Sequence, residues 1–234
     1  MKSPALTARD RLIVALDFPT PAKALALVSV LSDSVSIYKI GLQLYTAAGP
    51  AIIQAVAATG ASIFLDLKLH DIPNTVAKAV AAAGEHGVQM LTVHLSGGSA
   101  MLKAAAEAKP PQLSLLGVTV LTSVTQETLG ETGVTGSLED QVARLGELGK
   151  NSGIDGLITS PHEVRLLRKR LGSEITLVTP GVRPAWAAAD DQKRFTTPAE
   201  AVKAGADYLV IGRPITADPD PRAAVERVVD EMAG

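Results

Sequence analysis

The sequence predicts an α/β protein that folds as one domain, a (β/α)8 TIM barrel over residues 1–234. Its length suits such a barrel, which is often a single domain of this size. Short runs of β-branched residues alternate with Ala-rich helical stretches along the whole chain, as parallel strands and covering helices do. Hydrophobic residues make up 47% and aromatic residues only 3%, so aliphatic side chains must build the core. Periodicity does not show closure, and a doubly wound open sheet remains the structural alternative.

The expected strands and helices follow one another in order. The strands are expected at 12–16, 37–40, 62–67, 90–93, 113–120, 156–159, 175–178 and 208–211. The helices are expected at 21–32, 43–58, 73–86, 98–108, 137–150, 161–171, 197–204 and 219–232. Ser160-Pro161 and Thr197-Pro198 mark two helix starts, because proline is favoured in the first helical turn. Residues 183–197 show no clear period, which predicts a long loop on the active face.

Composition excludes several classes of function. The net charge of −2 gives no basic surface for nucleic acid or for an anionic membrane, so neither is an expected partner. The chain contains no cysteine, which excludes disulfides, thiolate catalysis and Cys-ligated metal centres. No apolar run approaches the roughly 20 residues that span a bilayer, and residues 1–11 lack the apolar core of a signal peptide. We therefore expect a soluble, cytoplasmic protein.

Polar side chains collect where the expected strands end. In a (β/α)8 barrel the active site lies at the carboxyl ends of the strands. The polar residues at these ends are Asp17, Lys39, Asp66, Lys68, His94, Thr122, Ser123, Arg183 and Arg213. Any one of them could cap a helix or lie on the surface, but together they predict a polar site at the barrel mouth.

Asp66 and Lys68 form the central pair of this site. They are two residues apart, so on an extended strand they point to the same side, into the barrel mouth, while the leucines beside them face the helices. A structural ion pair is the alternative. Against it, Lys39 and Asp71 add a second charge of each sign, and a buried row of charges is costly to desolvate. A proline in the first turn of the next helix places Ile72, rather than Asp71, at the N-cap.

Gly212-Arg213, after the eighth strand, fits a phosphate site. Glycine permits close backbone approach, arginine supplies paired donors, and barrels often bind phosphate after strands seven and eight. Arg183 and Gln192, on the long loop, are expected to close over the same group. The alternative is that Arg213 caps a helix or pairs with Asp218.

Histidines near the pair raise the possibility of a metal site. His70 and His94 could join Asp66, but their spacing matches no metal-binding motif. Lys68 would also repel a divalent cation. We therefore expect no metal.

The stretch Asp66-Leu67-Lys68-Leu69-His70-Asp71-Ile72-Pro73-Asn74-Thr75 resembles the signature of the orotidine 5′-monophosphate decarboxylase family. The resemblance covers essentially the whole chain. Its other motifs are Ala15-Leu16-Asp17, Tyr38-Lys39-Ile40-Gly41, Thr92-Val93-His94, Leu121-Thr122-Ser123, Thr179-Pro180-Gly181-Val182-Arg183-Pro184, Asp191-Gln192 and Ile211-Gly212-Arg213-Pro214. One departure is Leu95, where a small residue is expected.

The resemblance implies a homodimeric barrel without metal or organic cofactor. It would convert orotidine 5′-monophosphate to uridine 5′-monophosphate and carbon dioxide, the last step of de novo pyrimidine synthesis. Lys68 resembles the proton donor to C6, and Asp66 the carboxylate beside that of the substrate. Lys39 and Asp71 complete the charged row, and Asp71 and Thr75 are expected to reach into the partner's site. The resemblance also implies contacts of Asp17 and Lys39 with the ribose, and of Thr122 and Ser123 with the ribose and the pyrimidine. It implies phosphate contacts from Arg183, Gln192, Gly212 and Arg213. Ile72 and Pro180 are implied as further substrate-binding residues.

Three other functions remain open at this point. Magnesium-dependent sugar-phosphate enzymes, such as a keto-gulonate-phosphate decarboxylase or a hexulose-phosphate synthase, share the Asp-x-Lys-x-x-Asp pattern. They would need an acidic ligand where this chain has Lys39. A Schiff-base aldolase could use Lys68, although two flanking carboxylates favour a charged lysine. A non-catalytic phosphate-binding barrel is the third alternative.

Overall fold

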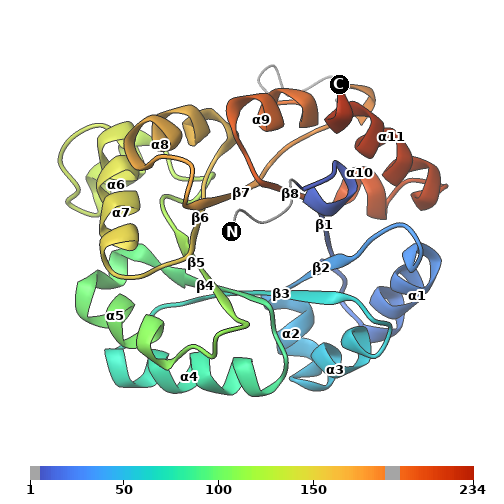
Figure 1. Cartoon of the computed structure of the whole chain (residues 1–234), viewed down its shortest axis with the longest axis horizontal. Helices are drawn as coiled ribbons and strands as arrows, with labels where there is room; N and C mark the ends of the chain where they lie inside the picture. The colour runs from blue at the N-terminus through green and yellow to red at the C-terminus, as the bar shows by residue number, and fades with distance from the viewer. Residues whose placement is uncertain (1–5, 188–195) are drawn as a thin grey trace.

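The computed structural model describes residues 6–187 and 196–234 of the chain. Within them, parallel strands close into a barrel in the order β1 to β8. The predicted fold class is therefore confirmed, and the alternative of an open sheet is wrong. Figure 1 shows the helices around the outside of the strands. The strands are β1 (Leu12–Ala15), β2 (Ile37–Gly41), β3 (Ser62–Leu69), β4 (Met90–His94), β5 (Ser114–Val118), β6 (Gly156–Ile158), β7 (Thr176–Pro180) and β8 (Tyr208–Ile211).

The helices alternate with the strands as predicted. The α-helices are α1 (Pro21–Leu31), α2 (Leu42–Ala48), α3 (Ala51–Ala57), α4 (Pro73–Glu85), α5 (Gly98–Ala108), α6 (Gln126–Glu131), α7 (Leu138–Asn151), α8 (Val164–Leu171), α9 (Pro198–Ala204), α10 (Arg213–Thr216) and α11 (Pro221–Ala233). Short 3-10 helices are η1 (Arg9–Arg11), η2 (Leu95–Gly97), η3 (Pro161–Glu163) and η4 (Ala185–Ala187). Of the described helices, none is long and apolar enough to cross a membrane.

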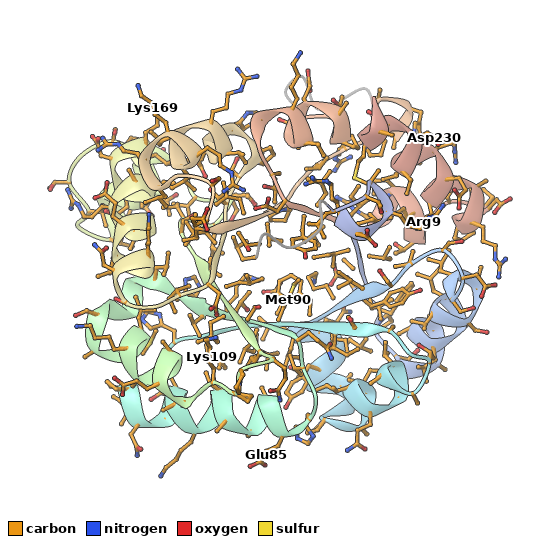
Figure 2. The ribbon with its side chains drawn as sticks, in the orientation of Figure 1. Arg9, Glu85, Met90, Lys109, Lys169 and Asp230 are labelled. Carbon is orange, nitrogen blue, oxygen red and sulfur yellow. The ribbon has the colours of Figure 1, made fainter. Side chains whose placement is uncertain are left out.

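Two hydrophobic layers hold the barrel together. The strands are apolar on both faces, so alternate residues of each strand enter different layers. One layer packs between strands and helices, whereas the smaller one fills the barrel and includes Ile13, Phe64 and Val178. Met90 packs against this inner layer, and in Figure 2 it lies near the centre of the ring of strands, with Glu85 at the rim. The inner layer supports the polar residues at the strand ends.

The predicted helix over 43–58 is in fact two helices. α2 ends before Gly49, which has a φ of 62°, and Pro50 is the N-cap of α3. A positive φ suits glycine, and a residue that precedes proline is disfavoured in the helical conformation. The Gly49-Pro50 pair therefore breaks the helix, and the apolar period on both sides of it concealed the break.

Other element boundaries differ from the prediction near the barrel mouth. β3 continues to Leu69 rather than 67, and β7 continues to Pro180 rather than 178. The short helices α6 and α10 were not predicted, because four to six residues are too few to show a helical period. Both predicted Pro-containing starts are confirmed. Ser160 and Thr197 cap η3 and α9 through capping boxes with Glu163 and Glu200.

Candidate active site

A cavity of about 380 Å³ opens at the carboxyl ends of the strands. Its wall comes from the ends of β1, β2, β3, β5, β6, β7 and β8 and from the loops after them. The polar lining residues include Asp17, Lys39, Asp66, Lys68, Thr122, Thr159, Arg183 and Arg213. The predicted polar site at the barrel mouth is therefore present, and it has a volume in the range of small-molecule sites.

A row of alternating charges lies on the floor of this cavity. Lys39 Nζ is 2.9 Å from Asp17 Oδ1 and 3.7 Å from Asp66 Oδ2. Lys68 Nζ donates to both oxygens of Asp66, at 2.8 and 2.9 Å. The side chains of Lys39 and Asp66 are only 11% and 13% exposed, so solvent screens them weakly. Such a row can orient an anionic substrate and stabilise charge that develops beside Lys68.

The backbone around Lys68 is less regular than an extended strand. Lys68 has a φ of 51°, and the register between β3 and β4 shifts between Leu65 and Leu69. The expectation that Asp66 and Lys68 share one side is confirmed by their contact, but the reason given for it is wrong. A bulged, left-handed residue, rather than simple strand alternation, brings the ammonium back over Asp66. The two-residue period of a sequence cannot reveal such a bulge.

Three further residues shape the site and were not predicted to do so. The Thr92 hydroxyl of β4 donates to Asp66 Oδ1 at 3.0 Å. Thr159 lines the cavity, and its hydroxyl donates to Glu163 at 2.9 Å. At Gly41, a Cβ would lie 2.9 Å from Lys39 Nζ and 3.2 Å from Asp17 Oδ1, so a side chain there would displace the Lys39–Asp17 ion pair. A polar residue within an otherwise apolar strand was the available signal for Thr92.

Arg183, Gly212 and Arg213, the described residues predicted to hold a phosphate, all line the cavity. They follow the neighbouring strands β7 and β8. Arg213 is exposed and lines the cavity. The alternative pairing with Asp218 is not the one observed, because Asp218 Oδ2 accepts from Arg227 Nη2 at 2.6 Å. Gln192 lies outside the described residues.

The two described ends of the predicted long loop are tied together and to α11. Arg183 N–H donates to the Thr196 carbonyl at 3.0 Å, and a parallel bridge joins Val182 to Thr196. The Arg227 guanidinium stacks on the Trp186 ring, 3.9 Å from its centroid. Packing against α11 thus holds the segment that carries Arg183.

The remaining predicted residues lie nearby but play different parts. Thr122 and Pro180 line the cavity. Ser123 is the next residue on the same exposed loop but is not among the residues that line the cavity. Asp71, Ile72 and Thr75 lie at the start of α4 and are exposed, Ile72 by 68%. None of these last three residues lines the cavity of its own chain. Ile72 is the N-cap of α4, as predicted.

His70 and His94 lie beside the charged row with their ring centroids 5.6 Å apart. Burial lowers the pKa of His94, and the positive charges of His70 and Lys68 lower it further. A neutral His94 is therefore favoured beside Lys68. Over residues 6–187 and 196–234, no group of three or more His, Cys, Asp or Glu is placed to hold a metal ion.

Leu95, the departure from the expected small residue, is completely buried in the layer between the strands and the helices. Two glycines accommodate it, because a Cβ at Gly117 would lie 2.8 Å from Leu95 Cγ and a Cβ at Gly149 2.7 Å from Leu95 Cδ2. The bulk at position 95 is thus offset by missing side chains on β5 and α7.

Known proteins share this sequence and architecture. The model of the orotidine 5′-phosphate decarboxylase / HUMPS family matches residues 10–228. The orotidine 5′-phosphate decarboxylase of Opitutus terrae is 52% identical over 94% of this chain and 97% of its own length. That of Syntrophotalea carbinolica is 48% identical over 97% and 96%. The crystal structure of the Lactobacillus acidophilus orotidine 5′-phosphate decarboxylase matches with a TM-score of 0.85 and 37% identity, over 95% of this chain and 99% of its own. The chain therefore belongs to the orotidine 5′-phosphate decarboxylase / HUMPS family.

Proposed function

We propose that this chain is a carboxy-lyase that converts orotidine 5′-monophosphate to uridine 5′-monophosphate and carbon dioxide. This reaction is the last step of de novo pyrimidine synthesis, which we expect in the cytoplasm. The observation that carries the proposal is the Asp66–Lys68 contact on the cavity floor, with Lys39 on the other side of Asp66. The names of the similar curated proteins support the same reaction.

Decarboxylation at C6 requires a cation that is held next to this carbon. Loss of carbon dioxide leaves a lone pair in the plane of the ring, where the ring cannot delocalise it. The protein must then stabilise the charge electrostatically and protonate it. Lys68 is the proposed donor, because its ammonium lines the cavity and Asp66 fixes its position.

Asp66 has a second proposed effect on the substrate. Its carboxylate would lie beside the substrate carboxylate and repel it, and this repulsion would be relieved as carbon dioxide leaves. At about 4 Å and an effective dielectric constant near 20, one contact between unit charges is worth about 4 kcal/mol. Enzymes lower barriers by about 8–23 kcal/mol, so one such contact is not sufficient.

In this proposal, binding of the distant phosphate supplies the rest of the barrier reduction. Arg183, Gly212 and Arg213 would hold the dianion, together with Gln192. Binding energy gained there can hold the pyrimidine against the charged row and exclude water. Asp17 and Lys39, 2.9 Å apart, would hold the ribose hydroxyls. Thr122, Ser123, Ile72 and Pro180 would contact the ribose and the base.

The charged row favours this function over a magnesium-dependent reaction of the same family. The Lys39 ammonium already lies 3.7 Å from Asp66, where a divalent cation would have to bind. Two adjacent cations would repel each other strongly in this weakly solvated position. We therefore propose that the enzyme needs no metal and no organic cofactor.

The proposed active unit is a homodimer with shared sites. Asp71 Oδ1 accepts a hydrogen bond from the neighbouring Ile72 N–H at 2.6 Å, and Asp71, Ile72 and Thr75 are all exposed. These side chains would complete the site of the partner subunit.

Mixing two inactive variants tests the shared site. Lys68→Ala and Asp71→Ala lie in different halves of the proposed site, so a mixed dimer contains one intact site. Random exchange should restore about one quarter of the wild-type activity. If the mixture stayed inactive after verified subunit exchange, the shared site would be wrong.

The function itself is tested by the ultraviolet absorbance of orotidine 5′-monophosphate. We expect the absorbance to fall when protein is added, at the same rate with and without EDTA. An unchanged absorbance would exclude the decarboxylase, and loss of activity in EDTA would favour the magnesium-dependent branch of the family.

A further inference from the structure

Thr92 joins the two residues that carry the proposed chemistry. It lies in the middle of β4 and is completely buried. Its hydroxyl donates to Asp66 Oδ1 at 3.0 Å and accepts the backbone N–H of Lys68 at 2.8 Å. One hydroxyl group therefore contacts the carboxylate of one residue and the main chain of the other.

The contact with Lys68 occurs where the strand pairing is interrupted. Lys68 is the single non-glycine residue with a positive φ within residues 6–187 and 196–234. This conformation is strained for a residue with a side chain, so the surrounding structure must stabilise it. The β3–β4 register shifts at this point, and the Lys68 N–H donates to the Thr92 side chain. The hydroxyl thus satisfies a donor that the bulge removes from the regular strand pairing.

The contact with Asp66 fixes the rotation of its carboxylate. Oδ1 accepts from both Thr92 and the Lys68 ammonium, whereas Oδ2 faces Lys68 and Lys39. A proton donor must approach the reacting carbon and lose its charge on proton transfer. The hydroxyl of Thr92 does not titrate, so it holds Asp66 in place throughout this change.

We propose that Thr92 is a positioning residue that sets the relative geometry of Asp66 and Lys68. The proposal rests on the decarboxylase function given above. Thr92 acts through the two residues and does not itself touch substrate. The rival explanation is that Thr92 only fills space between β3 and β4.

Two substitutions separate these explanations. Thr92→Val keeps the volume and removes the hydroxyl, whereas Thr92→Ser keeps the hydroxyl and removes a methyl group. Thr179→Val is the matched control, because Thr179 is equally buried in β7 and its hydroxyl lacks a hydrogen-bond partner among the described residues.

The expected readout is a selective loss of kcat. Misplacement of a reacting group by about 1 Å can cost on the order of 100-fold, so Thr92→Val should lower kcat by about 10-fold to 100-fold and change KM little. Thr92→Ser should keep a kcat within a few-fold of the wild-type value. Thr179→Val should have the wild-type kcat. If Thr92→Val retained the wild-type kcat, or if Ser and Val lost kcat equally, the proposal would be overturned.

A crystal structure of Thr92→Val tests the geometry independently of the reaction. We expect a rotated Asp66 carboxylate or a Lys68 φ that has left the left-handed region. Unchanged Asp66 and Lys68 geometry would overturn the positioning role. A wild-type protein that fails to consume orotidine 5′-monophosphate would instead overturn the proposed function and leave this structural comparison valid.

Discussion

The Leu95 side chain fills the space that a side chain at Gly117 would need, in the layer between the strands and the helices. In Gly117→Ala the new methyl carbon would lie 2.8 Å from Leu95 Cγ, well inside the usual contact distance of about 3.5–4.0 Å. Leu95 is completely buried and cannot swing into solvent. Overpacking of this kind costs about 1–3 kcal/mol, and removing a strand glycine returns about 0.5–1 kcal/mol. The midpoints of these two ranges leave a net cost of about 1 kcal/mol, which should lower the Tm by about 2–4 °C.

Gly117→Ala should no longer lower the Tm when Leu95 is replaced by a shorter side chain. Leu95→Ala alone leaves a cavity and should cost about 2–5 kcal/mol. Adding Gly117→Ala to it fills part of that cavity, so the double variant should melt at or above the Leu95→Ala single variant. Circular dichroism melts of the four proteins give the coupling directly. An equal Tm loss from Gly117→Ala in both backgrounds would refute the packing argument.

Three further predictions concern the site. Arg213→Ala should lower kcat/KM by about 10-fold to 150-fold, because a charge-assisted contact to phosphate contributes about 1.5–3 kcal/mol. The Tm should change little, because Arg213 is exposed. An unaffected kcat/KM would remove Arg213 from the phosphate site. Arg227→Ala should raise KM by about 2-fold to 5-fold through loss of the Trp186 contact, and an unchanged KM would contradict that role. Burial lowers the pKa of His94 below 6.5, so the unfolded state binds the proton more readily and stability falls as the pH drops below that value. His94→Gln should therefore lose less Tm than the wild type between about pH 7 and pH 5, and equal losses would contradict the assignment.

The fold was predictable because its cause is local and repeated. Alternating apolar runs and helical stretches leave few architectures that bury them all, and the barrel is one of these. The break at Gly49-Pro50 was missed because the apolar period continues on both sides, although the two residues themselves carried the signal. α10 is too short for a period to appear.

The charged pair was predictable from chemistry, but its geometry was not. Polar residues at strand ends stand out in an apolar sequence, and Asp17, Lys39, Asp66 and Lys68 do meet in one cavity. The left-handed backbone at Lys68 depends on a register shift between strands, which no local pattern encodes.

The role of Asp71 depends on a second chain. Its side chain is exposed in the described subunit, so neither the sequence pattern nor one subunit brings it to the charged row. Its place in the partner's site remains a prediction.

The central claim is that Lys68 delivers the proton to C6 while other residues hold the substrate. Its most direct test compares wild type and Lys68→Ala in the absorbance assay with orotidine 5′-monophosphate, with binding of uridine 5′-monophosphate measured by calorimetry on the same samples. The account predicts that the variant binds the nucleotide but leaves the absorbance unchanged even with enzyme in excess. Turnover close to the wild-type rate in Lys68→Ala would contradict it.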